Sequence, residues 1–126
     1  PMFDDTLCLT DTQREIQQLA RAFAREHVAP LAAEWDRDQH FEPSLVPKLA
    51  ESGFLGMLIP EEYDGLGLDS TSYLLALEEM AAADASTAVM MSVHNSLPTQ
   101  MLLAHGSEAQ KERYLKPMAR GEILGA

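Results

Sequence analysis

The stretch G-F-L-G-M-L-I-P-E-E-Y-D-G-L-G-L-D, residues 53–69, interrupts a sequence that otherwise has the apolar spacing of α-helices. It contains four of the seven glycines of the chain and one proline, and these residue types stop helices and fix turns. We therefore expect a specific backbone connection between two helical halves. The pair Gly65 and Gly67 also raises the alternative of a nucleotide-binding loop.

The composition is that of one globular domain, with 126 residues of which 46% are hydrophobic and 23% charged. The net charge of −11 repels phosphate backbones and argues against a nucleic-acid partner. No apolar run approaches the ~20 residues that a membrane-spanning helix needs. The acidic start, residues 2–5, lacks the basic region and apolar core of a signal peptide, which predicts a cytoplasmic protein.

Two helices are predicted before the glycine-rich stretch. The first begins after Thr10, whose spacing from Gln13 is that of a capping box. Pro30 lacks the amide donor of a helix interior, so we expect this helix to bend there. A second helix is expected from Pro43 to Gly53, because glycine accepts the left-handed conformation of a helix end. The apolar stripe of the first helix comprises Ile16, Leu19, Ala20, Phe23, Ala24, Val28, Leu31 and Trp35.

A third helix is predicted directly after the stretch. Its cap is Asp69, Ser70 or Ser72, residue types that accept hydrogen bonds from the free amides of a first helical turn. Its solvent side is expected to carry Glu78 and Glu79. Its expected buried side chains are Tyr73, Leu74, Leu77, Met80 and Ala81.

Two more helices complete the predicted fold. The fourth starts near Ser86 and runs toward Ala104, and Pro98 either bends or divides it. The last is short and begins after Ser107, which has a capping-box spacing from Gln110. Together the segments predict an all-α, up-and-down helical bundle of about five to six helices.

The end of the chain has a different pattern. The run E-I-L-G-A, residues 122–126, follows the predicted last helix and indicates the beginning of a strand without a partner strand in the chain. We therefore divide the chain into a helical domain, residues 1–121, and the start of a following β domain, residues 122–126. The alternative is a frayed tail.

No self-sufficient active site is predicted. Ser70 stands where a dinucleotide fingerprint has its third glycine, and no buried strand precedes Gly65, so the nucleotide-loop alternative is disfavoured. The histidines lack the four-residue spacing that places two metal ligands on one helix face, which predicts no metal site. We accordingly expect no catalytic and no cofactor-binding residue in this chain.

Several ordered motifs resemble the amino-terminal helical domain of the acyl-CoA dehydrogenase family, truncated before the flavin-binding β domain. One departure is visible, because Asp64 stands where the family usually has the first of two glycines after the tyrosine. Aspartate tolerates turn conformations, so the loop is expected to keep its shape. The residues that carry the resemblance are Phe23 with Val28-Ala29-Pro30, Leu49 to Gly53, Ile59-Pro60-Glu61-Glu62-Tyr63 with Gly65-Leu66-Gly67-Leu68, Val93-His94-Asn95-Ser96-Leu97, and Gln110-Lys111 with Tyr114-Leu115.

The resemblance implies a flavoenzyme of fatty acid metabolism. Such an oxidoreductase uses FAD to introduce a double bond between the α and β carbons of acyl-CoA, passes electrons to an electron-transfer flavoprotein, and is commonly a homotetramer. The flavin-binding residues and the catalytic base would lie in the parts of the parent beyond this chain. The 126-residue piece alone is therefore expected to be inactive and to bind no FAD.

For this domain the resemblance implies a role in the wall of the acyl-chain pocket. The implied substrate-binding residues are Val89, Met90, Val93, His94 and Leu97. A packing role in the bundle core is the alternative for these residues, and for His94 a hydrogen-bonded packing role in particular. The rival functions are a free-standing helical interaction module derived from this fold, and the same domain of an acyl-CoA oxidase or a nitroalkane oxidase.

Overall fold

The computed structural model describes residues 8–126, and within this range it is helical and contains no strand. Residues 1–7, which include the acidic start behind the cytoplasmic prediction, lie outside the described residues. The prediction of an all-α fold is confirmed. The elements are α1 (Asp11–Phe23), a π-helical turn (Ala24–Val28), α2 (Ala29–Asp38), α3 (Leu45–Glu51), a 3₁₀ turn (Glu61–Tyr63), α4 (Ser70–Ala83), α5 (Ala85–Ser96), α6 (Pro98–His105), α7 (Glu108–Gln110), a second π-helical turn (Lys111–Leu115) and α8 (Lys116–Ala119).

Three of the predicted helix starts rest on local side-chain contacts and are confirmed. Thr10 accepts a hydrogen bond from the Gln13 amide at 3.1 Å, and the Gln13 side chain accepts one from the Thr10 amide at 3.0 Å. Ser107 and Gln110 make the same reciprocal pair before α7. Of the three candidate caps for α4, Asp69 is the one used.

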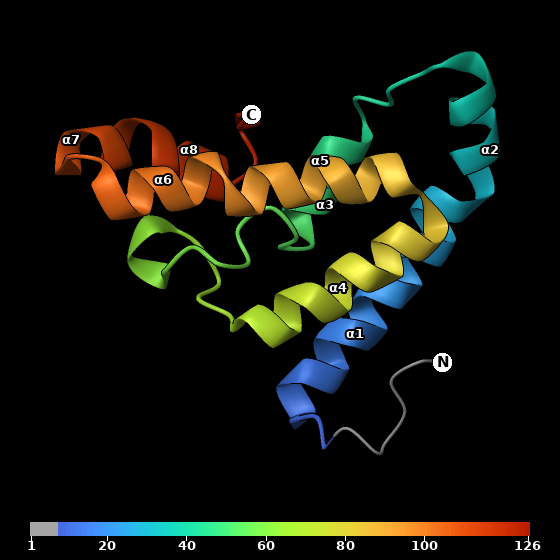
Figure 1. Ribbon diagram of the computed structural model, residues 1–126, viewed down its shortest axis with the longest axis horizontal. Helices are drawn as coiled ribbons and strands as arrows, with labels where there is room; N and C mark the ends of the chain where they lie inside the picture. The colour runs from blue at the N-terminus through green and yellow to red at the C-terminus, as the bar shows by residue number, and fades with distance from the viewer. Residues whose placement is uncertain (1–7) are drawn as a thin grey trace.

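The interruption expected near Pro30 takes the form of a π-helical turn. The turn covers Ala24–Val28, and Pro30 occupies the first turn of α2, where its missing amide donor costs little. Figure 1 shows α2 turning away from the direction of α1. The α3 helix begins at Leu45, two residues later than predicted, and Gly53 ends its turn with a φ of +84°.

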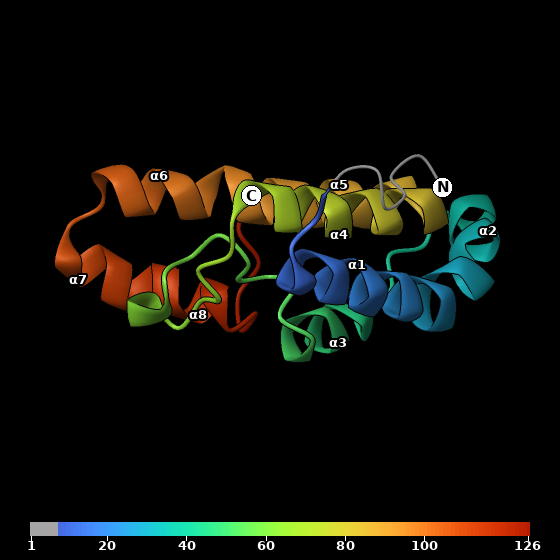
Figure 2. The ribbon, with the colours of Figure 1, turned by 90° about the horizontal axis from the view of Figure 1, so that it is seen from below.

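The helices form two layers (Figure 2). α4, α5 and α6 lie in one layer, and α1, α3 and α8 lie in the other. α1 packs along α4, and the Arg21 guanidinium donates to the Glu79 carboxylate across this contact at 2.7 Å. Glu79 was predicted to be exposed, but only 17% of its side chain is accessible, because α1 covers this side of α4.

The buried side of α4 also differs from the prediction. Tyr73 and Met80 are buried as expected, whereas Leu74 is 57% exposed and Leu75 is buried in its place. Packing explains the difference, because α4 contacts α1 on one side and α5 on another. Its apolar surface is therefore wider than one stripe and is rotated toward Leu75.

The glycine-rich stretch packs against itself and the ends of the helices. The Leu66 amide donates to the Gly56 carbonyl at 2.8 Å and the Leu68 amide to the Met57 carbonyl at 2.8 Å. A side chain at Gly65 would overlap the Ile59 carbonyl, so this position requires glycine for close packing. The expectation of a specific backbone connection is confirmed.

The last residues, 122–126, form neither helix nor strand. A strand needs a partner to receive its hydrogen bonds, and none lies in the described part of the chain. The strand start and the domain boundary at residue 121 therefore stay predictions. The segment is nevertheless attached, because the Gly125 amide donates to His94 at 3.0 Å.

Candidate functional site

Helix α5 and its extension α6 form a nearly straight rod across the molecule (Figure 1). Pro98 divides the rod as predicted, since it cannot donate to the His94 carbonyl one turn earlier. The Thr99 hydroxyl lies 2.9 Å from that carbonyl and 2.8 Å from the Asn95 carbonyl, and it replaces the lost donor. The rod therefore stays in line through the proline.

One side of this rod exposes apolar side chains. Val89, Leu97 and Met101 are 61%, 58% and 63% exposed, and Val93 between them is half-buried. Steps of four residues place all of them on one side of a helix. We call Val89, Val93, Leu97 and Met101 the apolar stripe. It contains three of the five residues predicted to bind substrate.

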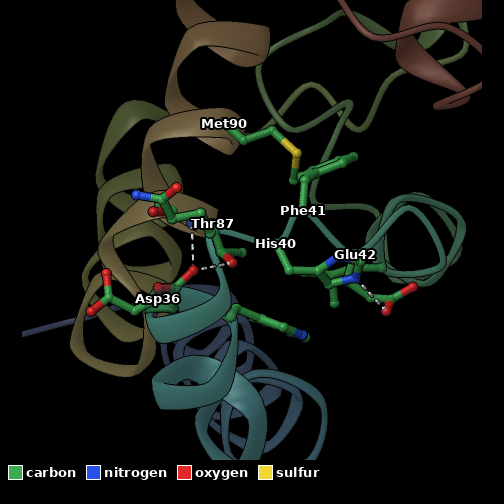
Figure 3. Close-up of a pocket in the computed structure, with 11 residues that line it drawn as sticks. Asp36, His40, Phe41, Glu42, Thr87 and Met90 are labelled. Atoms are coloured by element: carbon green, nitrogen blue, oxygen red, sulfur yellow. Dashed lines mark hydrogen bonds and ion pairs between the residues drawn. The ribbon is translucent and has the colours of Figure 1, made fainter.

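Met90 lies beside the stripe and lines a cavity of about 370 Å³ between the end of α2, the following loop and the start of α5. In Figure 3 its thioether points toward Phe41, which is on that loop. Trp35 and Leu45 add apolar surface to the same cavity. Met90 therefore borders both the stripe and this cavity.

Two of the three acidic side chains that line the cavity, Glu42 and Asp84, accept hydrogen bonds from neighbouring residues. Glu42 accepts from the amide and the hydroxyl of Ser44 at 3.1 and 2.7 Å, and these bonds lower the pKa of its carboxyl group. Asp84 accepts from the amide and hydroxyl of Thr87 as the cap of α5. A carboxylate used in this way is a structural cap rather than a general base.

His94, the fourth of the predicted residues, lies about 100° around α5 from Val93 and is fully buried. Its Nε2 donates to the Met118 carbonyl at 2.9 Å, and its Nδ1 accepts from the Gly125 amide at 3.0 Å. Burial lowers the pKa of this imidazole, against the opposing effect of the Met118 and Leu55 backbone groups. The contacts are those of the hydrogen-bonded packing alternative.

Asn95, to which sequence reasoning gave no role, is a second buried polar anchor. Its side-chain amide donates to the Phe54 and Met91 carbonyls at 2.9 Å each, and its oxygen accepts from the Met57 amide at 3.3 Å. It thus joins α5 to the glycine-rich stretch. The available signal was its place next to His94 in the Val93–Leu97 motif.

The glycine-rich stretch does not fit the phosphates of a dinucleotide. The amides of Gly65, Leu66, Gly67 and Leu68 donate to carbonyls within the stretch, at 2.8 to 3.1 Å. A phosphate cradle needs such amides free and convergent. Residues 8–126 also contain no group of three or more His, Cys, Asp or Glu side chains arranged to hold a metal ion. None of the helices described is long and apolar enough to cross a membrane.

The profile of the acyl-CoA dehydrogenase N-terminal domain matches residues 10–122. The chain therefore belongs to the acyl-CoA dehydrogenase family and corresponds to its N-terminal helical domain. It is 42% identical over 117 residues to the mitochondrial short-chain specific acyl-CoA dehydrogenase of Mus musculus, covering 93% of this chain and 28% of that protein.

Solved structures agree with this assignment. A chain of the electron transferring flavoprotein structure from Acidaminococcus fermentans matches with a TM-score of 0.89 and 39% identity, over 93% of this chain and 31% of that one. A glutaryl-CoA dehydrogenase from Mycobacterium smegmatis in complex with FADH2 matches with a TM-score of 0.91 and 29% identity, over 98% and 32%. This chain thus spans less than a third of the length of these relatives.

Proposed function

We propose that this chain is the N-terminal domain of an FAD-dependent acyl-CoA dehydrogenase, and that the apolar stripe with Met90 forms part of its acyl-chain pocket wall. The observation that carries the proposal is the row of exposed apolar side chains on an ordered helix. A row of this kind leaves a large apolar area in water unless something covers it. An acyl chain fits, since each buried methylene contributes about 0.8 kcal/mol.

In the proposed enzyme, this domain and the rest of the parent protein have different roles. FAD would accept the hydride from the β carbon of the substrate, and it would be held by residues outside this chain. The present residues would supply walls and exclude water, because the loop amides are engaged and the stripe offers only apolar surface. His94 would support the wall from behind rather than contact the substrate.

The substrate class proposed is acyl-CoA with a short acyl chain. Its length follows from side-chain bulk along the stripe, where branched and thioether groups limit how far a chain can extend. The printed name of the mouse relative, which is short-chain specific, supports the same choice. The proposed acceptor is an electron-transfer flavoprotein, the proposed assembly a homotetramer and the proposed location the cytoplasm, although the mouse relative is mitochondrial by name.

Substitution in the intact enzyme tests the wall. Val93→Phe should fill the end of the pocket and shift the preferred acyl chain to fewer carbons, and Met90→Trp should act in the same direction. Leu31→Phe is the matched control, since Leu31 is exposed on α2 away from the stripe. Initial rates with a series of saturated acyl-CoA substrates measure the preference. An unchanged preference in both variants, with the protein folded, would refute the wall assignment.

The interaction-module alternative is favoured by one observation, the exposed Ile123 and Leu124 near the chain end. The two functions differ in a simple assay. The proposed enzyme, purified intact, is yellow and reduces an electron acceptor with acyl-CoA. A colourless protein that binds another macromolecule through Ile123 and Leu124 would support the module. Hydrogen peroxide production with oxygen as the acceptor would instead indicate an oxidase.

A further inference from the structure

His94 is the one fully buried ionisable side chain of α5, and its contacts reach the end of the chain. It touches the Met118 carbonyl on α8 and the Gly125 amide, which lie 24 and 31 residues further along. Gly125 is also packed closely on Pro98, where a side chain would overlap the proline ring. The segment after α8 is thereby fixed against the end of α5, at His94 and Pro98.

The two hydrogen bonds define one protonation state. A carbonyl oxygen only accepts, so Nε2 must carry hydrogen, and a backbone amide only donates, so Nδ1 must carry none. The neutral imidazole with hydrogen on Nε2 satisfies both partners. A second proton on Nδ1 would face the Gly125 amide, break that bond and leave a buried charge.

Among residues 8–126, no charged side chain is recorded against the ring, and only the Met118 and Leu55 backbone groups favour its charged form, against the larger effect of burial. The groups that face it are backbone groups of Leu55, Met118 and Gly125. The charged side chains on the neighbouring elements have other partners or are exposed: Asp84 caps α5, Lys116 pairs with Glu112, Arg120 pairs with Asp64 and Glu122, and Glu61, Glu62 and His105 are exposed.

We infer that His94 is a positioning residue and a proton-sensitive latch, which holds residues 122–125 on α5 when neutral and releases them when protonated. The inference does not depend on the proposed enzymatic function. If that function is correct, His94 also fixes where residues 122–125 run relative to α5, the helix that forms the pocket wall. Protonation of His94 at low pH would then weaken the support of α5 without changing a residue that contacts the substrate.

The sign of the pH effect follows from the burial. The pKa of His94 is lowered in the folded state, so the released state binds a proton more readily than the latched state. The latch is therefore complete above the ordinary histidine pKa of about 6.5 and weakens as the pH falls below it. Below that pH, the equilibrium for release increases by up to about tenfold per pH unit.

Hydrogen–deuterium exchange on the intact protein tests the latch. Exchange of the peptide containing Gly125 is followed at pH 7.5 and pH 5.5 and corrected for the intrinsic pH dependence of amide exchange. Protection of the wild type should fall about tenfold at the lower pH. His94→Asn places an oxygen near Nδ1 and keeps an acceptor for Gly125, so its protection should not depend on pH. His94→Leu should be unprotected at both.

Two controls keep the test decisive. His105→Gln removes an exposed histidine from α6 and should keep the wild-type profile. His94→Gln, which keeps a donor near Nε2, serves if His94→Leu does not fold, and it should be weakly protected without pH dependence. Equal pH dependence in the wild type and His94→Asn would overturn the inference. This result would leave the proposed function standing, since no step of the measurement uses activity.

Discussion

The two sides of α5 differ in what their side chains contact. On the buried side, His94 and Asn95 make hydrogen bonds to three separate segments of the chain, and neither side chain is accessible. On the other side, Val89 and Leu97 remain more than half exposed among the described residues. The buried side thus combines the apolar Ala88 and Met91 with hydrogen-bonded polar side chains, whereas the outward side exposes apolar side chains. Under the proposed function, the acyl chain covers this exposed apolar side.

The comparison predicts the largest loss of stability at Asn95. Asn95→Leu leaves three buried backbone groups without their side-chain partner. The Met57 amide loses its acceptor, and the Phe54 and Met91 carbonyls each lose a donor. We expect a loss of about 4 kcal/mol in the free energy of unfolding, because each unsatisfied buried group costs about 1–3 kcal/mol. Urea denaturation of the intact protein measures it. Ser96→Ala, which alters the exposed neighbour, is the control, and a similar cost for the two variants would remove the distinction between the sides.

An intermediate effect is expected where the proline divides the rod. Thr99→Val keeps the side-chain shape but removes the hydroxyl that serves the His94 and Asn95 carbonyls. The expected cost is about 1.5 kcal/mol, the typical price of leaving a buried acceptor unpaired. Thermal unfolding is a suitable measurement, with Thr99→Ser as the variant that should retain most of the stability. If Thr99→Ser lost as much as Thr99→Val, the methyl packing rather than the hydroxyl would be responsible.

The sequence predicted the features that depend on neighbours a few residues apart. The caps at Thr10, Asp69 and Ser107 and the break at Pro98 follow from local chemistry, and all are present. The family resemblance implied that Val89, Met90, Val93, His94 and Leu97 line a substrate pocket, and this assignment stays a prediction. Helical periodicity alone would have assigned the same residues to the core.

The features that were not predicted correctly concern side chains whose surroundings are set by distant segments of the chain. Leu74 was expected inside and Glu79 outside, yet the position of α1 against α4 decides both. The roles of His94 and Asn95 depend on carbonyls and amides 24 to 41 residues away, which no local spacing encodes. Polar side chains in a helical interior therefore indicate anchors, but their partners come only from the fold.

The smallest effect is expected at the ion pair between the first and fourth helices. In the wild type, the hydrogen bond from Arg21 to the Glu79 carboxylate raises the pKa of the guanidinium. Glu79→Gln removes the negative charge and weakens this bond. Because both side chains are partly accessible, we expect a loss of only about 0.5–1 kcal/mol, further reduced by salt. Chemical denaturation at low and high ionic strength measures the loss of stability and its dependence on salt. A larger, salt-independent loss would mean that Glu79 contributes through packing.

The proposed pocket wall requires the outward side of α5 to contact the acyl chain. Its most direct test is photolabelling of the intact protein with an acyl-CoA that carries a diazirine at the end of the acyl chain, followed by mapping of the modified peptide. We predict labelling within residues 89–97, suppressed by excess unlabelled acyl-CoA. Suppressible labelling confined to other parts of the protein, with residues 89–97 unmodified, would contradict the claim.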